Sequence, residues 1–243
     1  GLKKIPFIDW IVASSAKARY DLAISNLLPV EQEVLELQKL QISTTALHHK
    51  YEMVPLLARQ YGVDESHVIL TFGGTQGIFV VFRCLLSRGD EILLEVPNYE
   101  PLYKIPSSYN ATIKSIERSF ERKFQIDLEE VQRKISRNTS CVVLTNTHNP
   151  SGAAINRDKL VAIGQISRDH DAYVVCVETF LEGAFNGDLA PGATCGENII
   201  SIGSMSKIYG LDGLRIGWII CRDDQLAAKM RNMLFQVLNG PYP

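Results

Sequence analysis

From residue 67 onward, short apolar runs alternate with stretches whose apolar residues recur at helical spacing. The apolar runs, which predict strands, cover residues 68–72, 91–96, 112–116, 141–146, 173–177, 198–203 and 216–221. The helical stretches cover residues 76–86, 101–107, 128–135, 157–169 and 225–238. Strands that are apolar almost throughout are buried on both faces, which is typical of a parallel sheet covered by helices. The pattern therefore predicts an α/β layer fold.

The first 66 residues lack this alternation. Apolar residues at helical spacing predict helices over residues 7–20, 30–40 and 51–62, the last ended by Gly62 as a C-terminal cap. Residues 21–29 read as an extended, turn-like segment, and residues 73–75 are expected to form a turn before the next helix.

Composition limits the classes of partner. The 243 residues suffice for one sizeable core, and the net charge of -2 without a basic block disfavours nucleic acid and anionic membranes as partners. The five cysteines are scattered without a CxxC pair, and the histidines show no zinc-like spacing, so we expect reduced core cysteines and no metal site. With no signal peptide and no apolar stretch long enough to cross a bilayer, a cytoplasmic protein is expected.

One lysine stands out by its position. Lys207 ends the run from Ser204 to Lys207, on a loop between two predicted buried strands, and Arg215 follows eight residues later. Burial and a neighbouring positive charge both disfavour an ammonium group, so the pKa of such a lysine is expected to fall. A free amine is what Schiff-base formation needs. The alternative is an ordinary surface lysine after a strand.

Three further loops follow predicted strands, and in open α/β sheets ligands bind outside the carboxyl ends of the strands. Gly74 and Thr75 precede a helix and offer backbone N–H groups and a hydroxyl that suit a phosphate. Tyr99 can stack on a planar ring, and Asn149 can present its amide to a ligand. Each feature alone also fits a routine turn or core packing.

Together, the four loops resemble the class I and II aminotransferases, which are fold-type I pyridoxal-phosphate enzymes. The motifs that carry the resemblance are Gly-Gly-Thr, Pro-x-Tyr, His-Asn-Pro-Ser-Gly, and Ser-x-Ser-Lys with Gly-x-Arg-x-Gly. The resemblance runs from about Asp21 to the end of the chain. Within the family, the chain most resembles the prokaryotic-type, aspartate-aminotransferase-like branch. It implies a three-layer fold with a mostly parallel sheet, a pyridoxal 5'-phosphate cofactor and a homodimer.

The resemblance also implies a division into domains. Residues 1–41 are expected to contribute to a small domain, and residues 42–243 to form the large cofactor-binding domain. The rest of the small domain, which in this family carries the arginine for the substrate α-carboxylate, is expected to be absent from the chain. No residue here is therefore a candidate for that arginine.

The resemblance gives roles to individual residues. Lys207 would form the Schiff base and then move the α-proton. Tyr99 would stack on the pyridine ring, and Asn149 would donate to its 3-oxygen. The residues implied to hold the cofactor phosphate are Gly74, Thr75, Ser204, Ser206 and Arg215.

Two implied cofactor-site positions depart from the family pattern. Val177 stands where the family has the Asp that pairs with the pyridine nitrogen, and Phe180 replaces a Tyr that bonds the 3-oxygen. Glu178 is not expected to replace the Asp, because adjacent strand residues point to opposite faces.

We therefore expect an enzyme of amino acid metabolism that transfers an amino group between an amino acid, aspartate or aromatic, and a 2-oxo acid. The alternatives are a lyase or racemase on the same fold, or a catalytically impaired cofactor-binding homologue or fragment. Val177 motivates both.

Overall fold

The computed structural model describes residues 4–14, 17, 19–20, 23–35, 52–185 and 189–237. The strands are β1 (Val68–Phe72), β2 (Glu91–Val96), β3 (Thr112–Glu117), β4 (Thr139–Thr145), β5 (Tyr173–Val177), β6 (Ile199–Ser204) and β7 (Ile216–Ile220). The α-helices are α1 (Pro6–Ser14), α2 (Met53–Tyr61), α3 (Gly73–Leu85), α4 (Pro101–Ser108), α5 (Leu128–Lys134), α6 (Arg157–Arg168) and α7 (Asp224–Val237).

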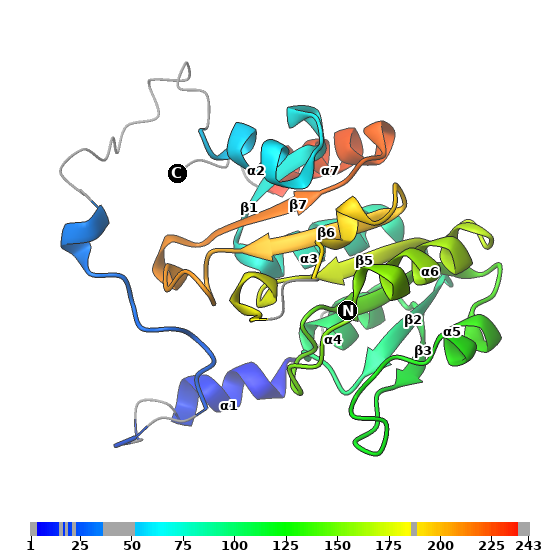
Figure 1. The fold of residues 1–243 in the computed structure, drawn as a ribbon, viewed down its shortest axis with the longest axis horizontal. Coiled ribbons are helices and arrows are strands. Elements are labelled where there is room, and N and C mark those ends of the chain that lie inside the picture. The colour runs from blue at the N-terminus through cyan, green and yellow to red at the C-terminus, as the bar shows by residue number, and fades with distance from the viewer. Residues whose placement is uncertain are drawn as a thin grey trace.

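The seven described strands form one sheet in the order β1-β7-β6-β5-β4-β2-β3 (Figure 1). The pairs from β6 across to β3 are parallel, whereas β7 runs antiparallel to both β6 and β1. A short link from β6 to β7 without a helical crossover accounts for this, because a parallel return needs a longer connection. The predicted α/β fold with a mostly parallel sheet is confirmed.

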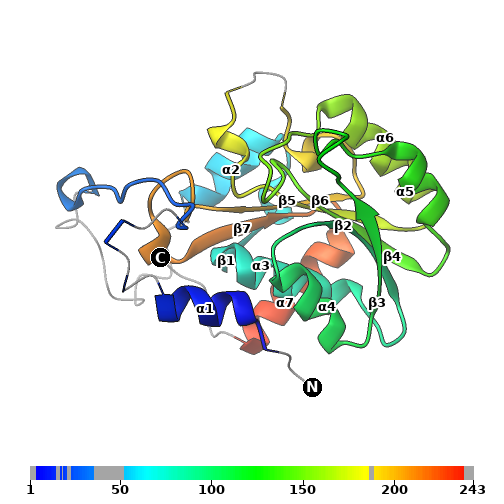
Figure 2. The same ribbon diagram turned by 90° about the horizontal axis from the view of Figure 1, so that it is seen from below.

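Helices cover both faces of the sheet, as Figure 2 shows with α3, α4 and α7 below it and α2, α5 and α6 above it. The apolar side chains of the strands divide between these faces. One face packs against α3, α4 and α7, and the other against α5 and α6 and, nearer β1, against α2. Because almost every residue of the central strands is buried, these strands read as continuous apolar runs in the sequence.

The expected turn at residues 73–75 is wrong, because these residues form the first turn of α3. The N–H of Phe72 donates to Oε1 of Gln76 at 2.7 Å, which caps the helix start. A Cβ on Gly217 would lie 2.6 Å from the carbonyl carbon of Gly73. Glycine at position 217 therefore lets β7 pass directly against the start of α3.

The N-terminal expectations are met in part. The first helix ends at Ser14 and not at residue 20, and the described part of the expected helix over residues 30–40 is a 3-10 turn, Gln32–Leu35. The third helix is α2, and Gly62 caps it in the left-handed conformation, as predicted. Residues 36–40, residue 238 and the predicted domain boundary between residues 41 and 42 lie outside the described residues. None of the described helices is long and apolar enough to cross a membrane.

A buried ion pair holds the end of β2. Nη1 of Arg118 lies 2.6 Å from Oε2 of Glu95, and both side chains are fully buried. The Nε of Arg118 donates to the carbonyl of Phe124, and Oε1 of Glu95 accepts from the backbone N–H and hydroxyl of Thr145. The amide of Asn98 donates to the same oxygen at 3.0 Å. One carboxylate therefore fixes the ends of β2 and β4 together with the loop after β2.

We expect Glu95→Gln to lower the free energy of unfolding by about 3–5 kcal/mol, because it leaves the Arg118 cation buried without its counter-charge. Chemical denaturation measures this. The matched control is Glu129→Gln, which removes an exposed carboxylate 4.0 Å from Arg133 and is expected to leave the stability unchanged within error. A loss no larger in Glu95→Gln than in the control would show that the buried pair does not stabilise this end of the sheet.

Candidate functional site

A cavity of about 500 Å³ lies at the edge of the sheet where β1, β2, β4, β5 and β6 end and β7 begins. All the residues that the sequence predicted for the site line it: Gly74, Thr75, Tyr99, Asn149, Val177, Phe180, Ser204, Ser206, Lys207 and Arg215. They come from loops far apart in the chain, and the sheet brings them to one place. This proximity is what the predicted roles require, but the roles themselves stay predictions.

Lys207 faces into this cavity and is half-buried. Its Nζ donates to Oδ1 of Asn26 at 2.7 Å and to Oγ of Ser25 at 3.1 Å. Burial lowers the pKa of Lys207; nearby Asp212 acts in the opposite direction, and Arg215 lowers the pKa further. The amine therefore loses its proton more easily than an exposed lysine does, as the sequence predicted.

Arg215, two serines and the start of α3 form the polar end of the cavity. Nη1 of Arg215 donates to the carbonyl of Asp212 at 2.9 Å, and a Cβ on Gly73 would lie 2.6 Å from its Nη2. The hydroxyl of Ser204 lies 2.8 Å from that of Ser206. The first N–H groups of a helix have no partner within the helix and attract anions. This end therefore suits a phosphate group.

Val177 lies on the floor of the cavity, in the same buried apolar cluster as Ile78 and Ile202. Glu178 points to the other face of the sheet, where Oε1 accepts a hydrogen bond from the backbone N–H of Gly192. The predicted placement of Glu178 on the face of the sheet opposite Val177 is confirmed by this geometry.

The turn that carries Asn149 is held by part-buried hydrogen bonds. The backbone N–H of Asn149 donates to Oγ1 of Thr145 at 3.2 Å. The neighbouring imidazole of His148 is buried, with Nε2 2.8 Å from the carbonyl of Pro97 and Nδ1 2.7 Å from the hydroxyl of Ser151. His148 therefore links the turn after β4 to the loop after β2, which carries Tyr99.

Sequence reasoning missed part of the cavity wall. Ser25 and Asn26 contact Lys207 directly, and Phe7, Ile8 and Ile11 of α1 also line the cavity. These residues lie in the N-terminal segment, which carries no motif, and no local sequence signal identifies them. A second cavity of about 490 Å³ adjoins the first and shares Ser25, Asn149 and Phe180 with it.

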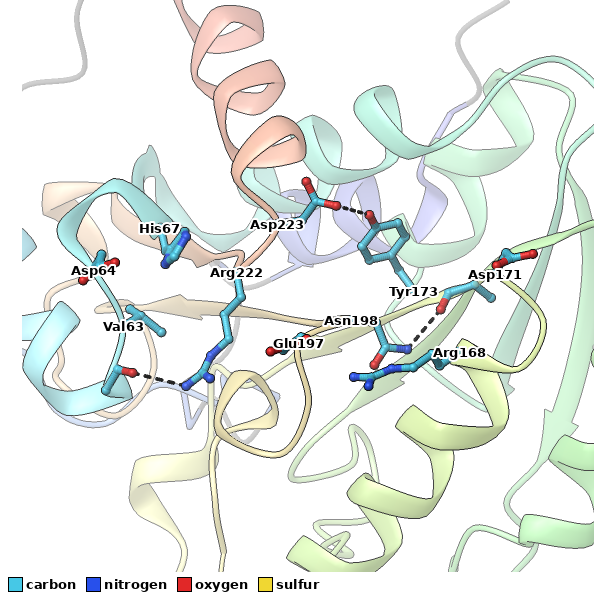
Figure 3. A pocket seen from close by; sticks show the side chains of 12 residues that line it. Val63, Asp64, His67, Arg168, Asp171, Tyr173, Glu197, Asn198, Arg222 and Asp223 are labelled. Carbon is cyan, nitrogen blue, oxygen red and sulfur yellow. Dashed lines mark hydrogen bonds between the residues drawn. The ribbon is translucent and has the colours of Figure 1, made fainter.

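A larger cavity, of about 910 Å³, lies at the opposite edge of the sheet (Figure 3). Its charged side chains include Arg168, Arg222 and Asp223, and the hydroxyl of Tyr173 donates to Oδ2 of Asp223 at 2.6 Å. None of the predicted site residues lines this cavity, and it lies at the amino ends of the parallel strands. Among the residues that the structure describes, no group of histidine, cysteine or acidic side chains is placed to hold a metal ion.

Comparisons with known proteins agree with this geometry. Residues 21–238 match the family model described as aminotransferase class I and II. The arginine–pyruvate transaminase of Pseudomonas aeruginosa is 28% identical over 73% of this chain and 46% of its own length. The aspartate aminotransferase of Pyrococcus horikoshii is 30% identical over 66% of this chain and 42% of its own length.

Among solved structures, a PLP-dependent aminotransferase from Streptococcus suis has the same fold, with a TM-score of 0.89 at 24% identity. This likeness covers 98% of the present chain and 67% of that structure. The chain spans about half the length of the curated relatives that it matches.

The buried carboxyl of Glu178, behind the floor of the cavity, is expected to make the free energy of unfolding depend on pH. Burial raises the pKa of Glu178 to about 7 from 4.5, although hydrogen bonds from Gly192 and Ser201 oppose the shift. Between these two values the folded chain holds a proton that the unfolded chain releases. The stability from this carboxyl is therefore present below pH 4.5 and lost as the pH rises through about 7.

We expect that raising the pH from about 5 to about 8 destabilises the wild-type protein relative to Glu178→Gln by up to about 3 kcal/mol, since glutamine keeps the neutral form at every pH. Denaturation curves across this range provide the measurement. Parallel pH dependence in the two proteins would contradict the prediction.

Proposed function

Because the chain belongs to the class I and II aminotransferase family, whose cofactor is pyridoxal 5'-phosphate, we propose that its protein transfers an amino group between an amino acid and a 2-oxo acid. The observation that carries the proposal is the position of Lys207, a half-buried amine with a lowered pKa beside a polar end that suits a phosphate. The relatives reported above are named as aminotransferases, which favours transamination over the lyase, racemase and impaired-homologue alternatives.

The residues of the cavity fit most of this cofactor. Gly73 leaves room for the guanidinium of Arg215, which therefore lies against the start of α3 beside the cavity. We propose that Arg215 binds the phosphate with charge-assisted hydrogen bonds, together with the other residues of the polar end, Gly74, Thr75, Ser204 and Ser206. Tyr99 would pack on the ring, and Asn149 would donate its amide to the ring oxygen.

Pyridoxal phosphate, when bound, supplies an electrophilic carbon and a ring that withdraws electrons from the substrate. Within this site we assign proton movement to Nζ of Lys207. The lowered pKa of Lys207 favours the neutral amine, the form that can accept the α-proton of the amino acid and return it. Asn26 and Ser25 orient Nζ through the hydrogen bonds described above, and the ring of Phe180, whose centroid lies 6.0 Å from Nζ, helps to exclude water.

Val177 does not fit the ring nitrogen. Its apolar side chain offers no hydrogen bond, and the acidic group nearest in sequence, Glu178, is occupied on the far face of the sheet. Among the described residues that line the cavity, Asp212 is the one with an acidic side chain. It lies at the polar end, where its backbone carbonyl accepts a hydrogen bond from Arg215. We therefore propose that the chain stabilises a protonated ring nitrogen weakly.

We also propose a homodimer in the cytoplasm, with residues 42–243 as the large domain and residues 1–41 contributing to the small one. Apolar side chains exposed in the N-terminal segment, such as Leu28 at 89% and Val34 at 70%, support a protein partner for this surface. The five free cysteines, four of them buried, support a reducing compartment.

The proposed role of Lys207 is tested with borohydride, which fixes a lysine-bound cofactor covalently. We expect wild-type protein incubated with pyridoxal phosphate to retain the cofactor on Lys207 after reduction, and Lys207→Ala to retain none there. Absorption spectra and peptide mass analysis measure this. The matched control, Lys104→Ala, removes a half-buried lysine outside the cavity and should behave as wild type. Cofactor fixed equally in Lys207→Ala would contradict the assignment.

The proposed effect of Val177 is tested by restoring a carboxylate. We expect Val177→Asp to raise the rate of amino-group transfer about tenfold or more, the size of one hydrogen bond to a charged group. Val177→Asn, of similar size but without charge, is the control and is expected to give a smaller gain. Single-turnover kinetics with a fixed amino donor measure both. Equal rates in the two variants would refute the electrostatic explanation.

A further inference from the structure

The imidazole of His148 lies between two loops of the candidate site. The side chain is buried, with 2% of its surface exposed. Its Nε2 lies 2.8 Å from the carbonyl oxygen of Pro97, on the loop after β2, and its Nδ1 lies 2.7 Å from the hydroxyl of Ser151, in the turn after β4. One side chain therefore bridges the loop that carries Tyr99 and the turn that carries Asn149.

The partners of His148 decide which ring nitrogen carries the proton. The carbonyl of Pro97 can only accept a hydrogen bond, so Nε2 is the protonated nitrogen and donates to it. In the neutral ring, Nδ1 then accepts from the hydroxyl of Ser151. Burial lowers the pKa of the imidazole, which favours this neutral form. The two hydrogen bonds together fix both the tautomer and the plane of the ring.

Further hydrogen bonds close the turn around His148. The backbone N–H of His148 donates to the carbonyl of Ala153 at 2.8 Å, and the N–H of Gly152 donates to the carbonyl of His148 at 2.7 Å. The hydroxyl of Ser151 also accepts from the N–H of Ala153 at 3.2 Å. Asn149 follows His148 directly within this turn. A change in the position of the imidazole therefore moves Asn149 as well.

The loop after β2 is connected to the imidazole just before Tyr99. The carbonyl of Pro97 belongs to the planar peptide unit that joins Pro97 to Asn98, so the hydrogen bond from His148 sets the direction of that unit. Oδ1 of Asn98 in turn accepts from the backbone N–H of Tyr99 at 2.7 Å. The orientation of Tyr99 therefore depends on the imidazole through one intervening residue.

The imidazole has a firm support on another side. The ring centroid of Phe124 lies 6.0 Å from that of His148, with 34° between the ring planes. The carbonyl of Phe124 accepts from Nε of Arg118, and Nη1 of Arg118 pairs with the buried carboxylate of Glu95. His148 thus packs against a loop that the buried ion pair holds in place, and such support is what a side chain needs to position others.

We propose, on the premise of the cofactor site proposed above, that His148 is a positioning residue, which holds the Asn149 turn and the Tyr99 loop in one arrangement so that a cofactor ring meets both groups at once. His148 is not among the described residues that line the cavity around Lys207, so it acts through these two neighbours. Groups that are arranged before a ligand arrives lose less freedom when it binds.

The first arm of the test measures binding of pyridoxal phosphate to the whole protein. His148→Leu removes both hydrogen bonds, whereas His148→Gln keeps an amide that can donate to Pro97. We expect His148→Leu to weaken cofactor binding at least about tenfold and to reduce the visible circular dichroism of the bound cofactor, which reports how the ring is held. His148→Gln should restore most of both. Equal losses in the two variants, or no loss in His148→Leu, would overturn the proposal.

The control for this arm is Ile163→Val. It removes one buried methyl group from α6, outside the described linings of both site cavities, so it lowers stability without touching the link. We expect cofactor affinity and circular dichroism to match the wild type, and denaturation curves report the stability of every variant. A loss of affinity as large as that in His148→Leu would show that reduced stability alone explains the effect, and it would overturn the role of His148.

The second arm uses the protein without cofactor, so that it separates this inference from the proposed function. Long-range proton–nitrogen NMR spectra, with the His148 signals assigned by their loss in His148→Gln, should show the proton on Nε2 at neutral pH. Hydrogen exchange of the backbone amides of Tyr99 and Asn149 should rise at least about tenfold in His148→Leu and stay unchanged in Ile163→Val.

The two arms fail in different ways. Should the wild-type protein bind no pyridoxal phosphate, the proposed function would fail, and the measurements without cofactor would decide whether His148 holds the two loops together. A proton on Nδ1 would remove the hydrogen bond to Pro97 and overturn the inference. Unchanged amide exchange in His148→Leu would overturn it as well.

Discussion

The site depends on the direction of the strands. Because β1, β2, β4, β5 and β6 all point the same way, the loops that follow them meet at one edge of the sheet. The antiparallel strand β7 starts at that edge and delivers Arg215 to it. The buried Glu95 and Arg118 pair then ties the neighbouring loops together, so that the edge is held by a charge interaction inside the core.

The parts of this structure that the sequence predicted are those that local pattern controls. Strand positions followed from apolar runs, and the site residues followed from motifs at strand ends, although their chemical roles still await experiment. The start of α3 was mispredicted, because glycine has a low helix propensity and the close approach of Gly217 to Gly73 is a tertiary effect. The contact between Asn26 and Lys207 spans 181 positions in the chain, and no periodicity encodes such a distance.

Positions 177 and 178 show how strand alternation limits the chemistry of a site. Val177 belongs to the cavity floor, while Glu178 is buried behind it with its own hydrogen-bond partner. A one-residue difference in sequence is thus a difference between two faces of the sheet. The carboxylate is close to the site in the chain and inaccessible to it in space.

Helix α1 has no buried residue, and the Phe7 to Glu100 hydrogen bond is one of the contacts that dock it. The free energy that keeps such a helix in place is small, and any ligand that covers its apolar side chains adds to it. Ligand affinity and helix docking are then linked equilibria, each strengthening the other by the same factor. A substitution that weakens the docking of this helix would thus shorten the time for which the ligand stays bound, even where the substituted residue never touches the ligand.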